Sequence, residues 1–289
     1  MASASLFLLI ALSPAPAGTA DTAIARGAYL AAAAGCDQCH TDTGNGGLAY
    51  AGGRGLATEF GVISTPNITP DPATGIGGWS LGDFVGAMRW GIAPDGTHYT
   101  TAFPFPYFAR MTDSDLGDLK AFLDSLAPVS RPGTGGAASL ALFPRMRAAL
   151  GAALAANFPP PRVAEPPPTD PRIARGAYLV TAVGHCGQCH TPLNWYGAPD
   201  ARRDLAGSSG RLGTPKAPDI TPDPKSGIGS WSEDQIVDLL ATGGTPDGDF
   251  VGGAMAEIVR NTARLTDDDR RAIAAYLKAV PPKVFPENK

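Results

Sequence analysis

Two cysteine–histidine motifs are the residues of this sequence best suited to do chemistry. Both read C-x-x-C-H, and their members are Cys36, Cys39 and His40 in the first copy and Cys186, Cys189 and His190 in the second. Two thiols at this spacing can add to the two vinyl groups of a haem as thioethers, and the histidine that follows then lies under the iron as a ligand. The motifs use all four cysteines of the chain. They predict two covalently bound haem c groups, here called haem 1 and haem 2.

Three other uses of such cysteine pairs fit the sequence less well. One zinc ion could take both pairs, but the pairs lie 150 residues apart in separate copies of a repeat, and each is followed by a histidine. A redox-active dithiol usually accompanies a strand–helix pattern, which this sequence lacks. A structural disulfide across two intervening residues is uncommon. Haem attachment is therefore the interpretation that we carry forward.

The second axial ligand decides what a haem iron does, because a methionine sulfur raises the reduction potential and closes the iron to substrates. In the second copy, Met255 lies on a glycine-rich loop, GGAMAE, between the haem motif and the last helix. It is the only methionine after Met146. We expect Met255 to be the sixth ligand of haem 2. The alternative is a methionine that only fills the core.

In the first copy, Phe103 occupies the position of Met255 and cannot bind iron. Met111 follows shortly after it, where the second copy has Leu265 just before a helix. We therefore expect that the ligand has moved along a loop that is two residues shorter, and that Met111 binds haem 1. His98 on the same loop is an alternative that would lower the potential, and an iron without a sixth ligand is a third. Met111 could also be a hydrophobic staple for the helix that follows.

Two prolines and two tryptophans recur after the motifs. Pro66 and Pro218 occupy equivalent positions, and each can orient its proximal histidine through a backbone carbonyl. Trp79 and Trp231 follow glycine-rich turns. Each can pack on the haem edge, donate its N–H to a propionate, or anchor its helix in the core.

All these residues belong to an internal repeat. The run IARGAYL begins at Ile24 and again at Ile173, and PNITPDPATGIGGWS in the first half matches PDITPDPKSGIGSWS in the second. Blocks that recur in the same order indicate a duplicated domain. We expect a signal peptide at 1–20, domain 1 at 21–128, a proline-rich linker with a helix at 129–171, and domain 2 at 172–289.

The helices that must position the motifs can be placed from their caps. One helix precedes each cysteine pair, a second begins after Ser80 or Ser232, and a third begins at Thr112 or Thr266. Serine and threonine are N-cap residues, and Ser232 forms a capping box with a glutamine three residues later. No convincing run of strands appears. The predicted fold class is all-α, with two tandem domains joined by a proline-rich linker. The chain has 36 glycines and 28 prolines, and we expect its long loops to wrap around a large apolar cofactor.

The N-terminus and the charge bear on location and partners. Residues 6–12 are apolar and are followed by small residues up to Ala17 or Ala20, which is typical of a cleaved export signal and too short for a membrane span. We expect a periplasmic bacterial protein without a transmembrane span in the mature chain. The net charge is −4, and the first half is acidic, which suits a basic protein partner and disfavours nucleic acid.

The chain resembles the diheme c-type cytochromes that serve periplasmic dehydrogenases, and it is similar to the cytochrome subunits of quinoprotein alcohol dehydrogenases. The resemblance rests on GAYL, TPNITPD, TGIGGWS, APDG, PFPYFARMTDSDL and their second-half counterparts, over nearly all of the mature chain. It implies two tandem cytochrome c domains, and electron relay between redox protein partners, namely a dehydrogenase and a cytochrome or oxidase. Those subunits typically have methionine at the position of Phe103, and they usually bear three haems and a C-terminal anchor. We expect two haems and no anchor here.

Two functions are therefore open. An electron carrier needs no catalytic residue, because the iron alone changes oxidation state, and this is the function that we favour. The alternative is a diheme oxidoreductase in which haem 1 acts on a small sulfur compound or peroxide. That function needs an exchangeable or absent sixth ligand, and the sequence offers no further cysteine to bind the iron. A sensor is disfavoured because no output domain is apparent.

Overall fold

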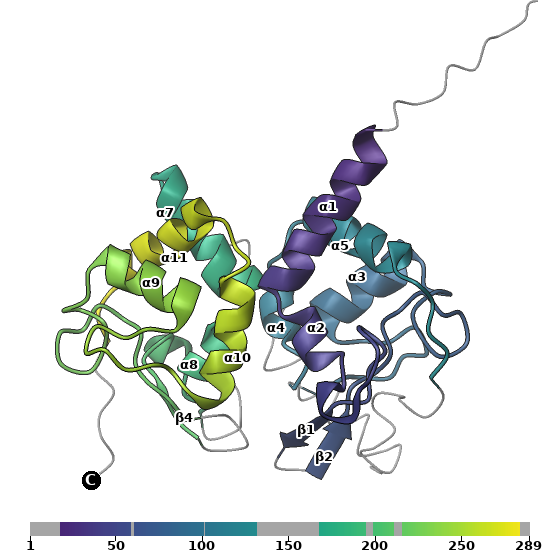
Figure 1. The fold of residues 1–289 in the computed structure, drawn as a ribbon, viewed down its shortest axis with the longest axis horizontal. Coiled ribbons are helices and arrows are strands. Elements are labelled where there is room, and N and C mark those ends of the chain that lie inside the picture. The colour runs from purple at the N-terminus through teal and green to yellow at the C-terminus, as the bar shows by residue number, and fades with distance from the viewer. Residues whose placement is uncertain are drawn as a thin grey trace, which may run out of the picture.

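The structure, a computed structural model, describes residues 18–58, 61–100, 102–131, 168–194, 199–210 and 216–283. These residues form two helical domains that lie side by side (Figure 1). Domain 1 is the purple-to-teal part of the ribbon, and domain 2 is the green-to-yellow part. Most of the predicted linker and its helix, at 132–167, and residues 1–17 of the predicted signal peptide lie outside the described residues.

The two domains are built on one plan. Domain 1 consists of α1 (Gly18–Ala33), α2 (Cys36–Cys39), η1 (Thr43–Asn45), β1 (Gly55–Thr58), β2 (Gly61–Ser64), α3 (Leu81–Trp90), α4 (Phe105–Phe108) and α5 (Asp113–Ser125). Domain 2 consists of α7 (Pro171–Tyr178), η3 (Leu179–Val183), α8 (Gly187–His190), η4 (Ala201–Arg203), β3 (Ser208–Ser209), β4 (Lys216–Ala217), α9 (Glu233–Thr242), α10 (Gly253–Thr262) and α11 (Asp267–Ala279). The element η3 is a turn of π-helix that continues α7 towards the second motif.

The helix starts that the sequence predicted are confirmed. Ser232 caps α9 and forms the predicted capping box with Gln235. Ser80 caps α3 and also forms a capping box, in which the N3 residue is Asp83. Threonines cap the last helix of each domain, Thr112 at α5 and Thr266 at α11. Because the caps recur at equivalent positions, the helices of both domains begin in the same register.

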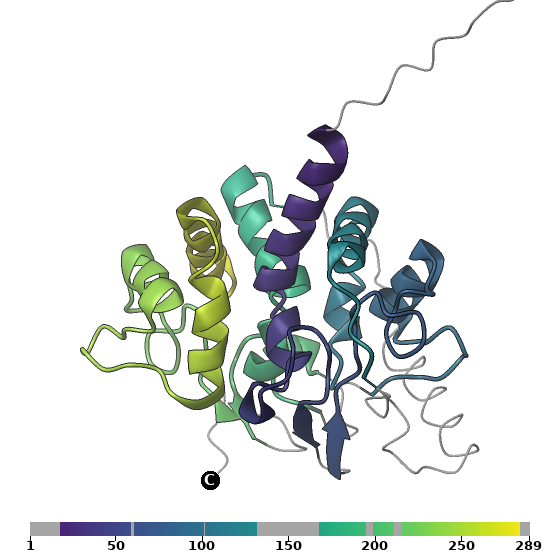
Figure 2. The same ribbon diagram turned by 45° about the vertical axis from the view of Figure 1, so that its right-hand side comes forward.

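In each domain the first long helix packs along the last one. The pairs are α1 with α5 and α7 with α11, and they lie side by side in both views (Figure 1, Figure 2). A glycine permits each close approach: a Cβ on Gly27 would collide with the carbonyl oxygen of Asp118, and one on Gly176 with that of Ala272. This close packing fixes the position of the first helix, and with it the point at which the chain enters the haem motif.

The prediction that the domains lack strands is wrong for the described residues. Strands β1 and β2 form an antiparallel hairpin with Gly55 opposite Ser64, and β3 and β4 pair with Ser208 opposite Ala217. A strand of four residues or fewer is too short for an alternating pattern to be recognised in the sequence. Both hairpins lie in the loop between the haem motif and the following TPD sequence. They are short insertions in that loop and add no layer to the fold.

The two domains are joined by a reciprocal arrangement of tyrosines. Each tyrosine, from the first helix of one domain, accepts a hydrogen bond from the N-cap amide of the other domain's last helix and donates one to an aspartate in its first turn. The groups are Tyr29 with Thr266 N (3.1 Å) and Asp269 Oδ2 (2.6 Å), and Tyr178 with Thr112 N (3.1 Å) and Asp115 Oδ2. The interface therefore has the approximate two-fold symmetry of the repeat.

Candidate haem sites

Each C-x-x-C-H motif forms a single helical turn, α2 in domain 1 and α8 in domain 2. In domain 1 the amide of His40 donates to the carbonyl of Cys36 at 2.9 Å, and in domain 2 the amide of His190 donates to the carbonyl of Cys186 at 3.0 Å. The carbonyl of each histidine in turn accepts from a glycine amide at 2.8 Å, Gly52 in the first case and a glycine of the equivalent loop in the second. The two turns thus share the bonds of their histidines, whereas the amide of Cys39 donates to the carbonyl of Gly35 and that of Cys189 to the carbonyl of Cys186.

The proximal histidines are oriented by the carbonyls that the sequence predicted. Nδ1 of His40 lies 2.8 Å from the carbonyl oxygen of Pro66, and Nδ1 of His190 lies 2.8 Å from that of Pro218. A carbonyl only accepts, so Nδ1 carries the proton in both rings and Nε2 keeps its lone pair. Burial lowers the pKa of both histidines, which keeps the imidazoles neutral. A neutral imidazole with a free Nε2 is the form that binds iron.

The cysteines are available for haem attachment. All four are free thiols. Burial raises the pKa of Cys36 and of Cys186 to about 12, and it also raises the pKa of Cys39 and of Cys189 above the usual value. Cys39 is exposed, and the other three side chains are partly exposed. Among the described residues, no three His, Cys, Asp or Glu side chains gather around one point, as a site for a bare metal ion would require.

The donor set fits a haem in both domains. Two separate thiols on one helical turn match two thioether bonds, and the adjacent histidine offers a free Nε2 to the iron. The apolar surroundings fit as well, because Cys36 and Cys186 pack against the hydrophobic core. Trp79 and Trp231 are half-buried against the same core, in keeping with the anchoring role that was one of their predicted uses. A propionate bond from either indole remains a prediction.

Met255 lies in a helix, and the prediction that it lies on a loop is wrong. It occupies the first turn of α10, whose N-cap, Gly252, offers no side-chain hydrogen bond. Gly253 takes a left-handed φ of 57°, which lets the chain turn from the glycine-rich loop into the helix. Met255 is half-buried, so its sulfur is held by the domain without being sealed in the core.

Domain 1 has an aromatic cluster at the corresponding place. Phe103 stacks edge-on against Tyr99, with ring centroids 5.6 Å apart, and tilts against Phe108 at 5.6 Å. The four-residue α4 follows it, where domain 2 has the ten-residue α10. The shorter loop predicted for domain 1 thus replaces most of a helix with a cluster of rings.

Met111 is buried just before the N-cap of α5, with 1% of its surface exposed. Its carbonyl accepts a hydrogen bond from Arg89 at 2.8 Å. Leu265 occupies the equivalent place before α11, is 6% exposed, and has a carbonyl that accepts from Arg270. The two side chains are therefore core residues at the same point of the repeat, although only the methionine can bind iron.

His98 lies in a turn, and its side chain is not buried as that of Met111 is. Its backbone pairs with Ile92 in an isolated bridge, as the backbone of Phe250 pairs with Gly244 in domain 2. Phe250 is 70% exposed, so this position of the turn directs its side chain outwards in the second domain. His98 itself is partly exposed.

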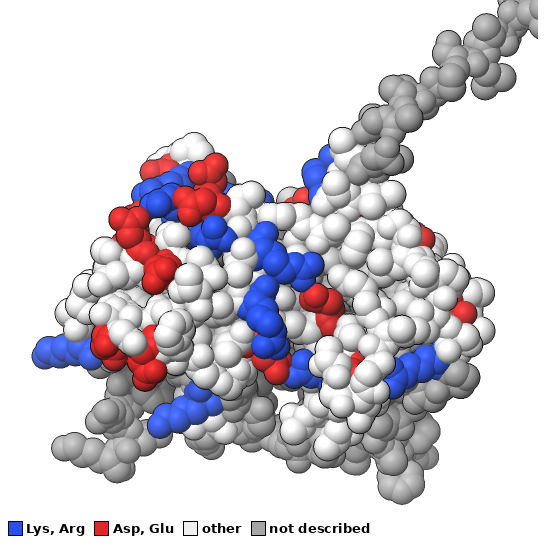
Figure 3. Space-filling view, viewed as in Figure 1, with Lys and Arg blue, Asp and Glu red and all other residues white. Residues whose placement is uncertain are grey.

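Several contacts between the first motif and domain 2 were not predicted. Arg54 donates to the Glu257 carboxylate at 2.7 Å and to the Gln38 carbonyl at 2.8 Å, so it joins α2 to α10. Arg264 donates to Asp37 at 2.8 Å. On the face shown in Figure 3, basic side chains line the junction between the domains. These partners lie 203 and 227 residues apart, which is why no local sequence pattern reveals them.

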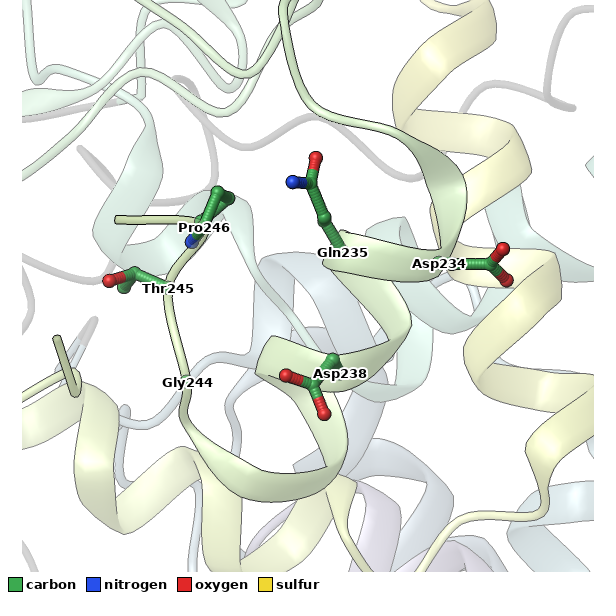
Figure 4. A pocket seen from close by; sticks show the side chains of 6 residues that line it. All are labelled: Asp234, Gln235, Asp238, Gly244, Thr245 and Pro246. Atoms are coloured by element: carbon green, nitrogen blue, oxygen red, sulfur yellow. The ribbon is translucent and has the colours of Figure 1, made fainter. Parts of the chain in front are cut away.

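A surface hollow of about 210 Å³ lies away from both motifs. Its lining is Asp234, Gln235 and Asp238 from α9 together with Gly244, Thr245 and Pro246 from the loop that follows (Figure 4). None of the cysteines or histidines of the motifs contributes to it, so it has no part in the haem chemistry.

The Cytochrome c family matches residues 24–127 and 173–281, and each match contains one complete motif. The chain belongs to the cytochrome c family. It carries two cytochrome c domains and two covalently bound haem c groups, and it is an electron-transfer cytochrome. None of the described helices of this cytochrome has both the length and the apolarity needed to cross a membrane.

Relatives of this cytochrome include subunits of several dehydrogenases. It is 43% identical over 259 residues to a diheme cytochrome c-type protein of Cereibacter sphaeroides, covering 89% of this chain and 85% of the relative. It is 41% identical to the cytochrome c subunit of a quinone alcohol dehydrogenase of Gluconacetobacter polyoxogenes, over 96% of this chain and 60% of the subunit. For the fructose dehydrogenase cytochrome subunit of Gluconobacter japonicus the values are 39%, 93% and 55%. The chain thus spans somewhat more than half of these dehydrogenase subunits.

The cytochrome's own residues perform a holding function. A bound haem supplies an iron that takes up and releases single electrons. The paired thiols would hold each haem covalently, and the Pro66 and Pro218 carbonyls fix the tautomer of the histidines that would bind the iron. Burial lowers the pKa of both histidines, which favours the neutral imidazole that would bind the iron.

Proposed function

We propose that this cytochrome relays single electrons from a periplasmic dehydrogenase to a downstream cytochrome or a terminal oxidase. The observation that carries the proposal is that the two candidate haem sites lie in domains that contact each other beside both motifs. Nε2 of His185, directly before the second motif, lies 3.2 Å from the carbonyl oxygen of Ala34, just before the first. The similarity to cytochrome subunits of alcohol, fructose and gluconate dehydrogenases supports a dehydrogenase as the donor.

The location follows from the predicted signal peptide at 1–20. Haem attachment through thioethers and an export signal are compatible with a periplasmic protein. Cell fractionation and N-terminal sequencing of the mature protein test this part. We expect a periplasmic product that begins after Ala17 or Ala20; an uncleaved cytoplasmic protein would refute it.

The relay is tested with the purified haem-loaded protein. Oxidised cytochrome is mixed with host membranes whose periplasmic face is exposed to the solution. One dehydrogenase substrate is added at a time, such as an alcohol, a sugar or a sugar acid. We expect at least one substrate to reduce both haems, and membranes without that substrate to leave them oxidised. Reduction by none of these substrates, together with turnover of peroxide or a sulfur compound by the cytochrome alone, would overturn the relay.

We propose Met255 as the sixth ligand of haem 2 and Met111 as that of haem 1. Half-burial in the first turn of α10 supports Met255, and burial inside domain 1 supports Met111 over His98, whose counterpart points outwards. Met255→Ala and Met111→Ala should each abolish the weak methionine-to-iron charge-transfer band of one haem and lower its potential. A Met111→Ala spectrum identical to that of the wild type rejects Met111.

A second candidate function is binding or turnover of a small molecule at haem 1. One observation favours it. Leu265 is buried at the equivalent place in domain 2, where the candidate ligand is Met255. Packing alone is therefore enough to account for the burial of Met111. In that case Phe103 stands where a ligand is missing, and the iron of haem 1 is open. Carbon monoxide binding to one haem of the reduced wild-type protein supports this function, and its failure to bind rejects it.

A further inference from the structure

His185 connects the two haem-attachment motifs directly. It immediately precedes Cys186, and its Nε2 lies 3.2 Å from the carbonyl oxygen of Ala34, two residues before Cys36. A single hydrogen bond thus connects the short segment that ends at the first cysteine of one motif with the residue before the first cysteine of the other. The two bonded residues are 151 apart in the sequence, and only the domain interface brings them together.

The geometry defines the direction of this bond. A backbone carbonyl only accepts, so Nε2 of His185 carries the proton and donates. Burial lowers the pKa of His185, which is consistent with a neutral ring. The ring also stands edge-on to Phe108 of domain 1, with centroids 5.4 Å apart and an interplanar angle of 87°. The side chain is therefore fixed from two sides by domain 1.

The backbone of His185 shows what holding this position requires. Its φ is 39°, a left-handed value that non-glycine residues seldom adopt. The residue directly before the first motif is Gly35, with a φ of 66°, so the turn into the motif takes a left-handed conformation in both copies. Domain 1 meets the demand with the residue that adopts it without strain, whereas domain 2 uses histidine. Strain of this kind persists where a side chain has a task that offsets it.

The partner of Gly35 explains why only one histidine is present. A Cβ on Gly35 would come 2.7 Å from the side-chain amide nitrogen of Asn261 in α10, which would have to shift, and the left-handed φ also favours glycine here. The approximate two-fold symmetry of the interface is thus broken next to the motifs: Asn261 fills one side and the imidazole of His185 fills the other. The tyrosine pairs at the helix N-caps, in contrast, occur on both sides.

We propose that His185 is a positioning residue for electron exchange between the two haems: its N–H holds the Ala34 carbonyl, fixes the two attachment turns relative to each other, and completes a short bonded connection between them. An electron leaves one haem as it reaches the other, and no bond forms or breaks. The proposal rests on the relay function. It is separable from that function, because exchange between the haems needs no partner protein.

The experiment measures intramolecular exchange in the half-reduced holoprotein by NMR. The haem-methyl resonances report exchange between the haems, and the part that does not depend on protein concentration is intramolecular. His185→Phe keeps a ring against Phe108 but removes the donor, and His185→Gln keeps an N–H that can reach the same carbonyl. Tyr29→Phe is the matched control, since it removes a hydroxyl that bridges the domains at α11, away from the motifs.

We expect His185→Phe to slow intramolecular exchange several-fold, with both haems attached and their spectra unchanged. His185→Gln should restore most of the rate, and Tyr29→Phe should leave it near that of the wild type. Should His185→Phe fail to retain both haems, His185→Gly takes the residue of the first copy, relieves the left-handed backbone, and should show the same slowing. The proposal would be overturned if His185→Phe exchanged electrons between the haems at the wild-type rate, or if Tyr29→Phe slowed this exchange as much as His185→Phe does.

Discussion

The attachment turns of the two domains hold their histidines with the same bonds, whereas the segments before the last helices differ. In both domains a proline carbonyl holds the proximal histidine at 2.8 Å and a glycine amide holds the histidine carbonyl at 2.8 Å. After the APDG and TPDG turns the domains diverge. Domain 1 continues with an aromatic cluster around Phe103 and the short α4, and domain 2 continues with α10 and its methionine.

The difference shows which parts of a haem domain are fixed by the cofactor and which are free. The turn that carries two thiols and an imidazole must match the spacing of the porphyrin's vinyl groups and iron, so both copies keep one geometry. The opposite segment needs only to offer a ligand, or none, and its surface is shaped by the neighbouring domain. In domain 2 this segment, α10, also bonds through Glu257 to Arg54 beside the first motif.

The largest effect should come from the glycines at the helix crossings, where the domains are alike. Gly27→Ala and Gly176→Ala each place a Cβ against a backbone carbonyl of the facing helix, which cannot rotate away. We expect each change to destabilise its domain by about 3 kcal/mol or more. Denaturant unfolding of the haem-loaded variants, followed at the haem absorbance, measures this. Equal losses in the two domains would support the common plan.

A control comes from the same pair of helices. Gly117 lies in α5, and a Cβ there would meet nothing within 4 Å. Gly117→Ala should therefore stabilise domain 1, by about 0.5–1 kcal/mol, because alanine favours helix. A loss of stability in this variant as large as that of Gly27→Ala would show that the close approach of α1 and α5 is not the cause.

The next effect tests the main difference by transplanting it. The double variant Phe103→Met, Met111→Leu gives domain 1 the arrangement of Met255 and Leu265 in domain 2. We expect haem 1 to show a methionine-to-iron charge-transfer band and a potential close to that of haem 2, because sulfur ligation stabilises the reduced iron. Near-infrared spectra and redox titration measure both. A double variant without the band would show that the two positions are not equivalent, despite their place in the repeat.

Much of the fold could be predicted because its signals are local. The caps at Ser80, Ser232, Thr112 and Thr266 and the motifs themselves are short patterns with a direct physical meaning. The bonds from His40 and His190 to proline carbonyls could be inferred because the loop recurs at the same place in both copies.

What escaped prediction depends on distant contacts or on very short elements. Met255 was expected on a loop because two glycines precede it, and the sequence does not show that the helix starts there. The hairpins are too short for a periodic signal. His185 was not singled out at all. Its signal was nevertheless present, since histidine stands where the first copy has Gly35 directly before a motif.

The smallest effect concerns the arginine in the first helix of each domain, which forms an ion pair with an aspartate in the last helix of the same domain. Arg175 donates to Asp269 at 2.8 and 2.7 Å, and Arg26 donates to Asp118. Arg175→Met should lower the free energy of unfolding by about 1–2 kcal/mol, since hydrogen bonds to a charged group are lost from a side chain that is 41% exposed. Arg26→Met should lower it less, because Arg26 is 56% exposed. Denaturant unfolding at neutral pH compares the two.

The pH dependence decides whether this pair acts through the charge of Asp269. Burial opposes ionisation of Asp269, but hydrogen bonds from Arg175 and from Tyr29 outweigh it, and the pKa is lower than usual for an aspartate. A lowered pKa contributes stability above the aspartate's unfolded pKa of about 4, and this contribution is lost as the pH falls through the folded value. The difference between wild type and Arg175→Met should therefore shrink in acid. If it stays constant as the pH falls, the arginine stabilises domain 2 by packing, and the charged bond is not what distinguishes the two domains here.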